Sequence, residues 1–144
     1  MLAAAKKKRP DPVAVLREHL VDVNCVAFHP EGHLLLSGDA DGYAKLWDLS
    51  TRRPLVSRRL HGHPVGILHL EFITVDHFLS QGRDGVVKVW ELENGTDVSR
   101  HPISSIPTGS YTFCNPVALR NAGTHTCEPP CVTHVAFPAA LEAN

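Results

Sequence analysis

An internal repeat constrains what this chain of 144 residues can fold into more than any other feature. Residues 34–49 align with residues 77–92, and the matched residues include both tryptophans of the chain. At an offset of 43, Ser37 matches Ser80, Asp41-Gly42 matches Asp84-Gly85, Lys45 matches Lys88, and Trp47 matches Trp90. Further upstream, His19 matches His63 and Phe28 matches Phe72, both at an offset of 44. A period of this length indicates two copies of one supersecondary unit.

Each unit contains short segments that have the composition of β-strands. In the first unit they cover residues 23–28, 33–37, 43–48 and 54–59, and in the second residues 67–72, 77–81 and 86–91, followed by a turn at Asn94-Gly95. Asp-Gly and Asn-Gly favour two-residue hairpin turns because these residues tolerate positive φ angles. Helical periodicity is absent along the chain. We therefore predict an all-β fold of two four-stranded antiparallel units.

Composition and charge exclude several functional classes. The formal net charge is −1, whereas a protein that neutralises phosphates is normally basic, so nucleic acid is not favoured as a ligand. No apolar run approaches the ~20 residues that span a bilayer, so we expect no membrane insertion. The four cysteines are unevenly spread and the N-terminus does not have the order of a secretory signal. We expect an intracellular protein, in the nucleus, the cytoplasm or both.

The period and the Trp47-Asp48 pair resemble the WD40-repeat family of β-propellers, in which each repeat forms a four-stranded blade. The resemblance covers about residues 13–104, with Glu18-His19 in place of the usual Gly-His and Trp90-Glu91 in place of Trp-Asp. It implies a basic lead at 1–12, one blade at 13–60 and a second at 61–104. Residues 105–144 are then expected to begin a third blade and pass into an irregular tail containing proline and cysteine. Because propellers close with 4–8 blades, we expect an incomplete propeller with uncovered apolar faces.

A narrower resemblance covers about residues 10–115. Residues 10–17, 80–85 and 111–114 are similar to the G-protein β-subunit-like protein 1 and ASTRA-associated type of WD40 protein. That type implies a non-enzymatic scaffold for protein–protein contacts in the assembly of large phosphatidylinositol-3-kinase-like kinases or in chromatin-linked complexes. The implied partners are proteins, with no small-molecule substrate and no cofactor. A G-protein β-like signalling subunit is the alternative.

A histidine, a serine and an aspartate recur in each unit and invite comparison with a hydrolase triad. An enzyme needs one active site, whereas a repeated scaffold needs the same support in every repeat. The resemblance implies that these residues form a buried hydrogen-bond network with the tryptophan of each blade. The predicted members are His19, Ser37, Asp41 and Trp47 in the first unit, and His63, Ser80, Asp84 and Trp90 in the second.

Three further features lie outside the predicted networks. Arg83 precedes the turn aspartate, a position that lies on the narrow face of a propeller, so it is a candidate for binding a partner. The basic run Lys6, Lys7, Lys8 and Arg9 matches a nuclear localisation signal, and a solvated tail is the alternative. In the C-terminal segment, the cysteines and histidines of residues 125–134 fit no zinc-finger spacing, so we predict no metal site there.

Overall fold

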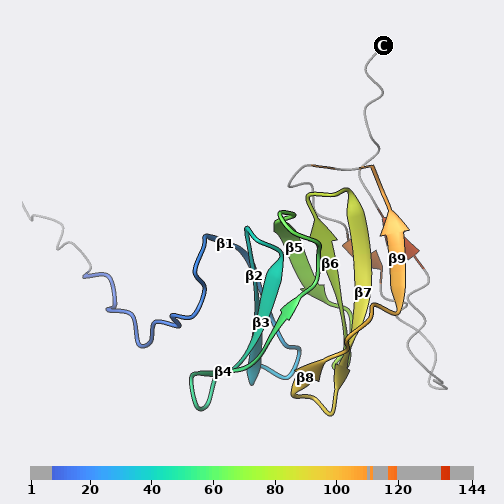
Figure 1. Ribbon diagram of the computed structural model, residues 1–144. Helices are drawn as coiled ribbons and strands as arrows, with labels where there is room; N and C mark the ends of the chain where they lie inside the picture. The colour runs from blue at the N-terminus through green and yellow to red at the C-terminus, as the bar shows by residue number, and fades with distance from the viewer. Residues whose placement is uncertain (1–7, 110, 112–116, 120–133, 137–144) are drawn as a thin grey trace, which may run out of the picture.

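The computed structural model describes residues 8–109, 111, 117–119 and 134–136. Two antiparallel β-sheets lie side by side, and the short strands β10 (Val117–Leu119) and β11 (His134–Ala136) pair with each other (Figure 1). The described residues form strands, turns and loops and contain no helix. The prediction of an all-β fold with two antiparallel units is therefore confirmed.

The first sheet follows the chain order, with each strand paired to the next along the sequence. Its strands are β1 (Val23–Phe28), β2 (Leu34–Asp39), β3 (Tyr43–Asp48) and β4 (Arg53–Arg59). The turn between β2 and β3 places Gly42 at a φ of 88°, which is the left-handed conformation that Asp-Gly was expected to supply.

The second sheet repeats this order but divides its outer edge between two short strands. Its strands are β5 (Ile67–Phe72), β6 (His77–Gly82), β7 (Val86–Glu93), β8 (Asp97–Val98) and β9 (Ser104–Pro107). One end of β7 pairs with β8 and the other end with β9. The boundary that we predicted at residue 104 therefore falls inside a strand of the second unit, because the backbone of β9 completes the edge that the short β8 leaves unpaired.

Equivalent backbone hydrogen bonds show that the two sheets are copies of one unit. The amide of Ala40 donates to the Asp22 carbonyl oxygen in the first, and that of Arg83 donates to the Gly66 carbonyl oxygen in the second, both at 2.9 Å. These bonds join the loop before the first strand to the turn after the second strand. The repeat in the sequence thus corresponds to a repeat in backbone geometry.

One hydrophobic core joins the two sheets, because β5 packs against β1 and β2. Alternate residues of β2 and β3 point into it, together with residues from β5, β6 and β7. Its most buried members are Leu36, Leu46, Ile67 and Phe78, each with no exposed surface. Burying one such side chain contributes about 1.5–3 kcal/mol, so the contact between the sheets is a main source of stability.

The segments that flank the two sheets are described only in part. Residues 8–12 of the basic lead are exposed and belong to no strand, and Lys8 forms an ion pair with Asp11 at 3.7 Å. Lys6 and Lys7 lie outside the described residues, as does most of the tail that we predicted at 105–144. In the part of the chain that the structure describes, no helix has the length and apolar character needed to cross a membrane.

Candidate functional site

The first hydrogen-bond network, which we define as Trp47, Ser37, His19 and Asp39, lies on the side of the first sheet that faces away from the second. The Trp47 indole Nε1–H donates to Ser37 Oγ at 2.8 Å, and Ser37 Oγ lies 2.6 Å from His19 Nε2. His19 Nδ1 lies 2.8 Å from Asp39 Oδ2. A neutral imidazole protonated on Nδ1 satisfies every contact, since the serine hydroxyl then donates to Nε2 and the imidazole donates to the carboxylate.

The carboxylate of this network comes from Asp39 and not from Asp41, which corrects our prediction. Asp39 is the last residue of β2 and lies two residues after Ser37, so the two side chains share one face of the sheet. Asp41 lies in the turn, and its own amide donates to Asp39 Oδ1 at 3.0 Å. Its side chain lines a pocket of about 200 Å³ beside Glu18, Tyr43 and Lys45.

The second network, which we define as Trp90, Ser80, His61 and Asp84, repeats the first in the second sheet. Trp90 Nε1–H donates to Ser80 Oγ at 2.9 Å, and Ser80 Oγ lies 2.9 Å from His61 Nε2. His61 Nδ1 lies 3.2 Å from Asp84 Oδ2. The same order of donors and acceptors therefore links tryptophan, serine, histidine and aspartate in both sheets.

The histidine of the second network is His61 and not the predicted His63, which is exposed. The amides of Leu60 and His61 both donate to the Gly42 carbonyl oxygen, at 2.9 and 3.4 Å. These bonds hold the connection between the sheets against the turn of the first sheet, and they place the imidazole of His61 over β6. The offset of 44 residues that matched His19 with His63 in the sequence is therefore not the structural equivalence.

The two networks take their carboxylates from positions that differ by two residues in the repeat. Gly82 occupies the position equivalent to Asp39, and a Cβ there would collide with the Nδ1 atom of His61. Because no side chain stands in this place, His61 packs over Gly82 and reaches Asp84. Each carboxylate also accepts a hydrogen bond from the amide that begins the third strand of its blade. Asp39 accepts from the Tyr43 amide at 3.0 Å, and Asp84 accepts from the Val86 amide at 3.1 Å.

Burial sets the charge of His61 in the folded chain. Its side chain has no exposed surface, and burial lowers its pKa, although the Asp84 carboxylate acts in the opposite direction and Lys88 adds to the lowering. The neutral form agrees with the order of hydrogen bonds in the network. Burial also lowers the pKa of His69, against the opposing effect of Glu71.

This lowered pKa predicts a loss of stability in acid. An unfolded chain protonates His61 near its ordinary pKa of about 6.5, whereas the folded chain does not, so the unfolded state binds more protons below that pH. We expect the free energy of unfolding to be highest above about pH 6.5 and to fall as the pH drops below it. Urea unfolding followed by tryptophan fluorescence across this range measures the slope.

The two neighbouring histidines supply a matched comparison for this slope. His61→Gln removes the titrating group and should flatten the acid slope, leaving the part that arises from His69. His63→Gln changes an exposed residue and should leave the slope as it is. An unchanged slope in the His61→Gln protein would contradict the assignment of His61 as the buried neutral histidine.

Other side chains of the two sheets that could be nucleophiles are buried or partly buried. Burial raises the pKa of the Cys25 thiol to about 12, and the Asp39 carboxylate adds to this effect while a hydrogen bond with the backbone of Gly38 opposes it. Cys25 is therefore a protonated thiol at neutral pH and not a nucleophile. Ser37 is 4% exposed and Ser80 is 0% exposed, and each Oγ accepts an indole N–H, so neither oxygen is open to a substrate.

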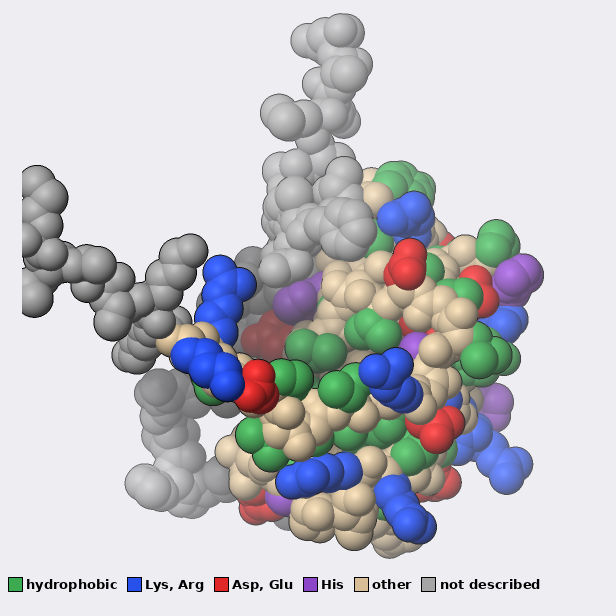
Figure 2. Space-filling view, turned by 90° about the vertical axis from the view of Figure 1, so that its left-hand side faces the viewer, with side chains coloured by type: hydrophobic (Ala, Val, Ile, Leu, Met, Phe, Trp, Pro, Cys, Tyr) green, Lys and Arg blue, Asp and Glu red, His purple; other side chains and the backbone are tan. Residues whose placement is uncertain are grey.

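An exposed apolar area, which we call the outer face, covers the side of the first sheet opposite the core. Phe28 is 66% exposed and Val26 is 55% exposed, and both lie on β1. The exposed side chains of Tyr43 and Leu55 belong to the same side of the sheet, because their neighbours Ala44 and Val56 point into the core. Figure 2, viewed from this side, shows hydrophobic side chains with Lys and Arg side chains around them. A rigid apolar surface of this kind is typical of protein contacts.

The remaining predicted site residues are not members of the two networks. Arg83 is exposed in the turn between β6 and β7, and its role in binding a partner stays a prediction. Lys8 and Arg9 are exposed in the N-terminal lead. Sequence reasoning missed Asp39 and His61, although the alternation of side chains along β2 would have placed Asp39 on the face of Ser37.

Comparison with known proteins agrees with the repeated geometry. A family model described as "WD domain, G-beta repeat" matches residues 10–48 and 55–91. A relative named ASTRA-associated protein 1 from Verticillium alfalfae is 33% identical over 97 residues, which cover 67% of this chain and 24% of that protein. The protein of the same name from Yarrowia lipolytica is 42% identical over 84 residues, 58% of this chain and 19% of that protein.

A third relative has a different name. The guanine nucleotide-binding protein subunit beta-like protein 1 of Mus musculus is 34% identical over 119 residues, which cover 78% of this chain and 35% of that protein. The chain therefore spans between about a fifth and about a third of the length of these relatives.

Proposed function

Because the chain belongs to the WD40 repeat family, we propose that it is a non-enzymatic scaffold that binds other proteins through the outer face of its first blade, the sheet β1–β4. The observation that carries this proposal is the exposure of Phe28 and Val26 on β1, at one edge of that face. Aromatic and aliphatic side chains that are exposed on a rigid sheet lose little conformational entropy on binding, and they form the anchors of protein interfaces.

The two hydrogen-bond networks support a structural role over a catalytic one. Each contains a serine, a histidine and an aspartate, but the serine in each accepts a hydrogen bond from a buried indole. Both serines are buried, so a substrate has no access to the oxygen that the histidine would activate. The networks occur once per blade and join the segment before the first strand to the second and third strands of that blade.

The names of the relatives support a more specific proposal. The fungal relatives carry the name ASTRA-associated protein 1, so we propose that this chain acts within an ASTRA-like complex. In that setting it contributes to the assembly of large phosphatidylinositol-3-kinase-like kinases or to chromatin-linked complexes. The partner surface is expected to offer an apolar centre and acidic side chains around it, because Arg53 and Arg59 are exposed on β4.

Affinity capture from a cell extract tests this function. The full chain is immobilised and the bound proteins are quantified by mass spectrometry, with Phe28→Asp as the variant of the outer face. We expect kinase-assembly or chromatin-complex subunits on the unmodified chain and a loss of about tenfold or more with Phe28→Asp, because a buried charge without a partner costs several kcal/mol. Ile103→Asp is the matched control, since Ile103 is exposed on a different segment.

Each outcome of the capture experiment has a clear meaning. Equal recovery on the Phe28→Asp and unmodified chains would contradict the outer face as the binding surface. Recovery of G-protein α or γ subunits in place of assembly factors would favour the alternative, a G-protein β-like signalling subunit. A third variant, Arg83→Ala, measures whether the turn between β6 and β7 contributes to the same contact.

A further inference from the structure

The outer face of the first blade is equivalent to the surface through which the second blade contacts the first. The register of the strands aligns the two blades residue by residue, starting from Ser37 and Ser80 of the two networks. The equivalent pairs are Val26 and Leu70, Phe28 and Phe72, Leu35 and Phe78, and Trp47 and Trp90. The four residues of the second blade are all buried in the core that joins the two sheets.

Phe28 and Val26 differ from their equivalents chiefly in what covers them. Phe72 is 3% exposed and Leu70 is 2% exposed, because the first blade lies over both, whereas Phe28 and Val26 are more than half exposed. The outer face therefore places apolar side chains at the positions that bind a sheet in the other copy of the repeat. A second sheet docked there would continue the contact that already joins the two blades.

The surface of the first blade that receives these large side chains is made of small residues. Cys25, Ala27 and Ala44 all pack against the core on this side of the sheet. No side chain fits at Gly38, because a Cβ there would lie 2.9 Å from Ile67 Cγ2 of the second blade. Small residues on one sheet thus accommodate large residues on the other, and a sheet that binds the outer face needs the same complementarity.

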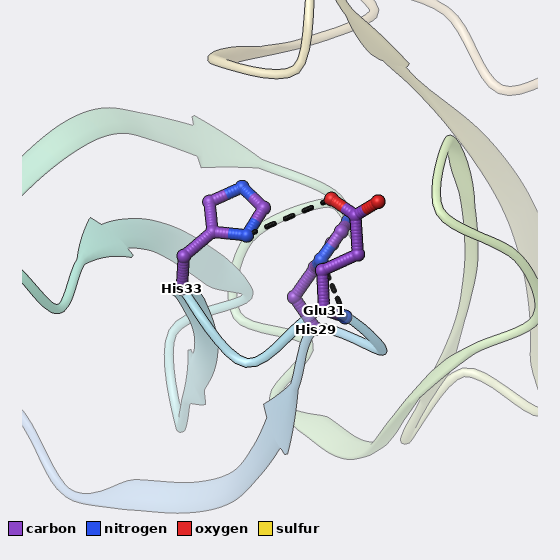
Figure 3. A group of neighbouring side chains, drawn as sticks. All are labelled: His29, Glu31 and His33. Carbon is purple, nitrogen blue, oxygen red and sulfur yellow. Dashed lines mark hydrogen bonds and ion pairs between the residues drawn. The ribbon is translucent and has the colours of Figure 1, made fainter.

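A polar loop of the first blade closes one end of this contact. The ring of His29 lies edge-on to the ring of Phe72, with their centroids 5.1 Å apart, and its Nε2–H donates to the Val75 carbonyl oxygen at 2.8 Å. Figure 3 shows His29 in the loop between β1 and β2, beside Glu31 and His33. The first blade therefore contributes both small apolar residues and a hydrogen-bonded loop to the contact.

The second blade of another copy of this chain does not offer such a surface. At the positions equivalent to Cys25, Ala27 and Gly38 it carries His69, Glu71 and Gln81. Docking of the outer face on these residues would bury the Glu71 carboxylate against apolar side chains, which is strongly unfavourable. It would also place the Gln81 side chain where the first blade has room for none. The head-to-tail contact that would build a chain of copies is therefore blocked.

We propose that the outer face binds a β-sheet of a different protein, and that His69, Glu71 and Gln81 exclude a second copy of this chain. The bound sheet carries residues of the size of glycine, alanine and cysteine opposite Val26 and Phe28, as a blade of another WD40 repeat protein can. This inference rests on the proposed function, because it names the kind of partner that the same face binds.

Site-specific photocrosslinking of the full chain in cultured cells tests which surface covers the outer face. Phe28→p-benzoylphenylalanine places the crosslinker on that face, and the crosslinked peptides are identified by mass spectrometry. We expect peptides from a β-strand of a different WD40 repeat protein that carries small residues on alternate positions. These peptides should be absent from the matched control, Ile103→p-benzoylphenylalanine, since Ile103 is exposed on another segment.

The crosslinked residues distinguish this inference from the proposed function. A crosslink to a helix of another protein would overturn the inference and leave the proposed function intact, because a partner would still cover the outer face. A chain without any crosslink at position 28 would contradict both.

Sedimentation velocity of the purified chain tests the exclusion of a second copy. The sedimentation coefficient should stay constant as the concentration rises, both for the unmodified chain and for Phe28→Asp. Oligomers that grow with concentration and disappear in Phe28→Asp, or crosslinks between two copies at position 28, would overturn the inference.

Discussion

Replacing Asp39 with alanine is expected to lower the free energy of unfolding by about 3 kcal/mol, whereas Asp41→Ala should lower it by less than about 0.5 kcal/mol. Asp39 accepts from His19 Nδ1 and from the amides of Asp41 and Tyr43. Removal of the carboxylate therefore leaves three N–H donors without an acceptor. One of them belongs to the buried imidazole of His19, and the other two are backbone amides of the turn that follows Asp39. Asp41 has its side chain in the pocket and gives the network only its backbone amide.

Urea unfolding followed by tryptophan fluorescence measures both variants, because Trp47 belongs to the first network and Trp90 to the second. The second blade supplies an internal comparison, since its carboxylate comes from the turn. There, Asp84→Ala should destabilise the chain, although by less than Asp39→Ala, because Asp84 is more exposed than Asp39. A larger loss for Asp41→Ala than for Asp39→Ala would mean that both blades use the turn aspartate.

A second large effect is expected at the turn where the two blades meet. Gly42 has a φ of 88°, and a Cβ built there would lie 2.5 Å from the Val65 carbonyl oxygen and 2.8 Å from the His61 carbonyl oxygen. Both are backbone atoms of the connection between the blades and cannot rotate away. Gly42→Ala should therefore cost about 3–5 kcal/mol, from left-handed strain and from the displacement of this connection.

Gly95→Ala is the control that separates strain from crowding. Gly95 also has a left-handed φ, 68°, but nothing lies within 4 Å of a Cβ built on it. Its substitution should cost only about 1–2 kcal/mol, the price of the backbone conformation alone. Thermal and urea unfolding of the two variants provide the comparison. Similar losses at the two positions would show that the blades do not meet closely at Gly42.

The strands and their faces could be predicted from the sequence because they depend on local patterns. Apolar alternation and the Asp-Gly turns act over a few residues, and each tryptophan lies within a hairpin of its own repeat. The register of the hairpins then places Ser37 opposite Lys45 and Ser80 opposite Lys88. The strand assignment of each repeat is supported by the other, since the same pattern of strands and turns occurs in both.

The residues that complete the networks could not be predicted in the same way, because they lie at the end of β2, in the turn after β6 or in the connection between the sheets. Asp39 and Asp41 are both close to the turn, and His61 and His63 are both close to the second blade, so spacing did not distinguish them. The choice depends on contacts between distant segments, such as the Gly42 carbonyl that holds His61 and the empty position at Gly82. The position of β9 could not be predicted for the same reason, because β9 pairs with the part of β7 that the short strand β8 leaves unpaired.

The loop between β1 and β2 follows the same division. His29, Glu31 and His33 stand at alternate positions in the sequence, but only the turn at Gly32 and the hydrogen bond from His29 to the Val75 carbonyl oxygen bring their side chains together. Short-range patterns in the amino-acid sequence thus define the repeat, the strands and the buried faces of this protein. Which loop side chains meet is determined by packing between the blades, because a loop has no periodic hydrogen bonding of its own to orient its side chains.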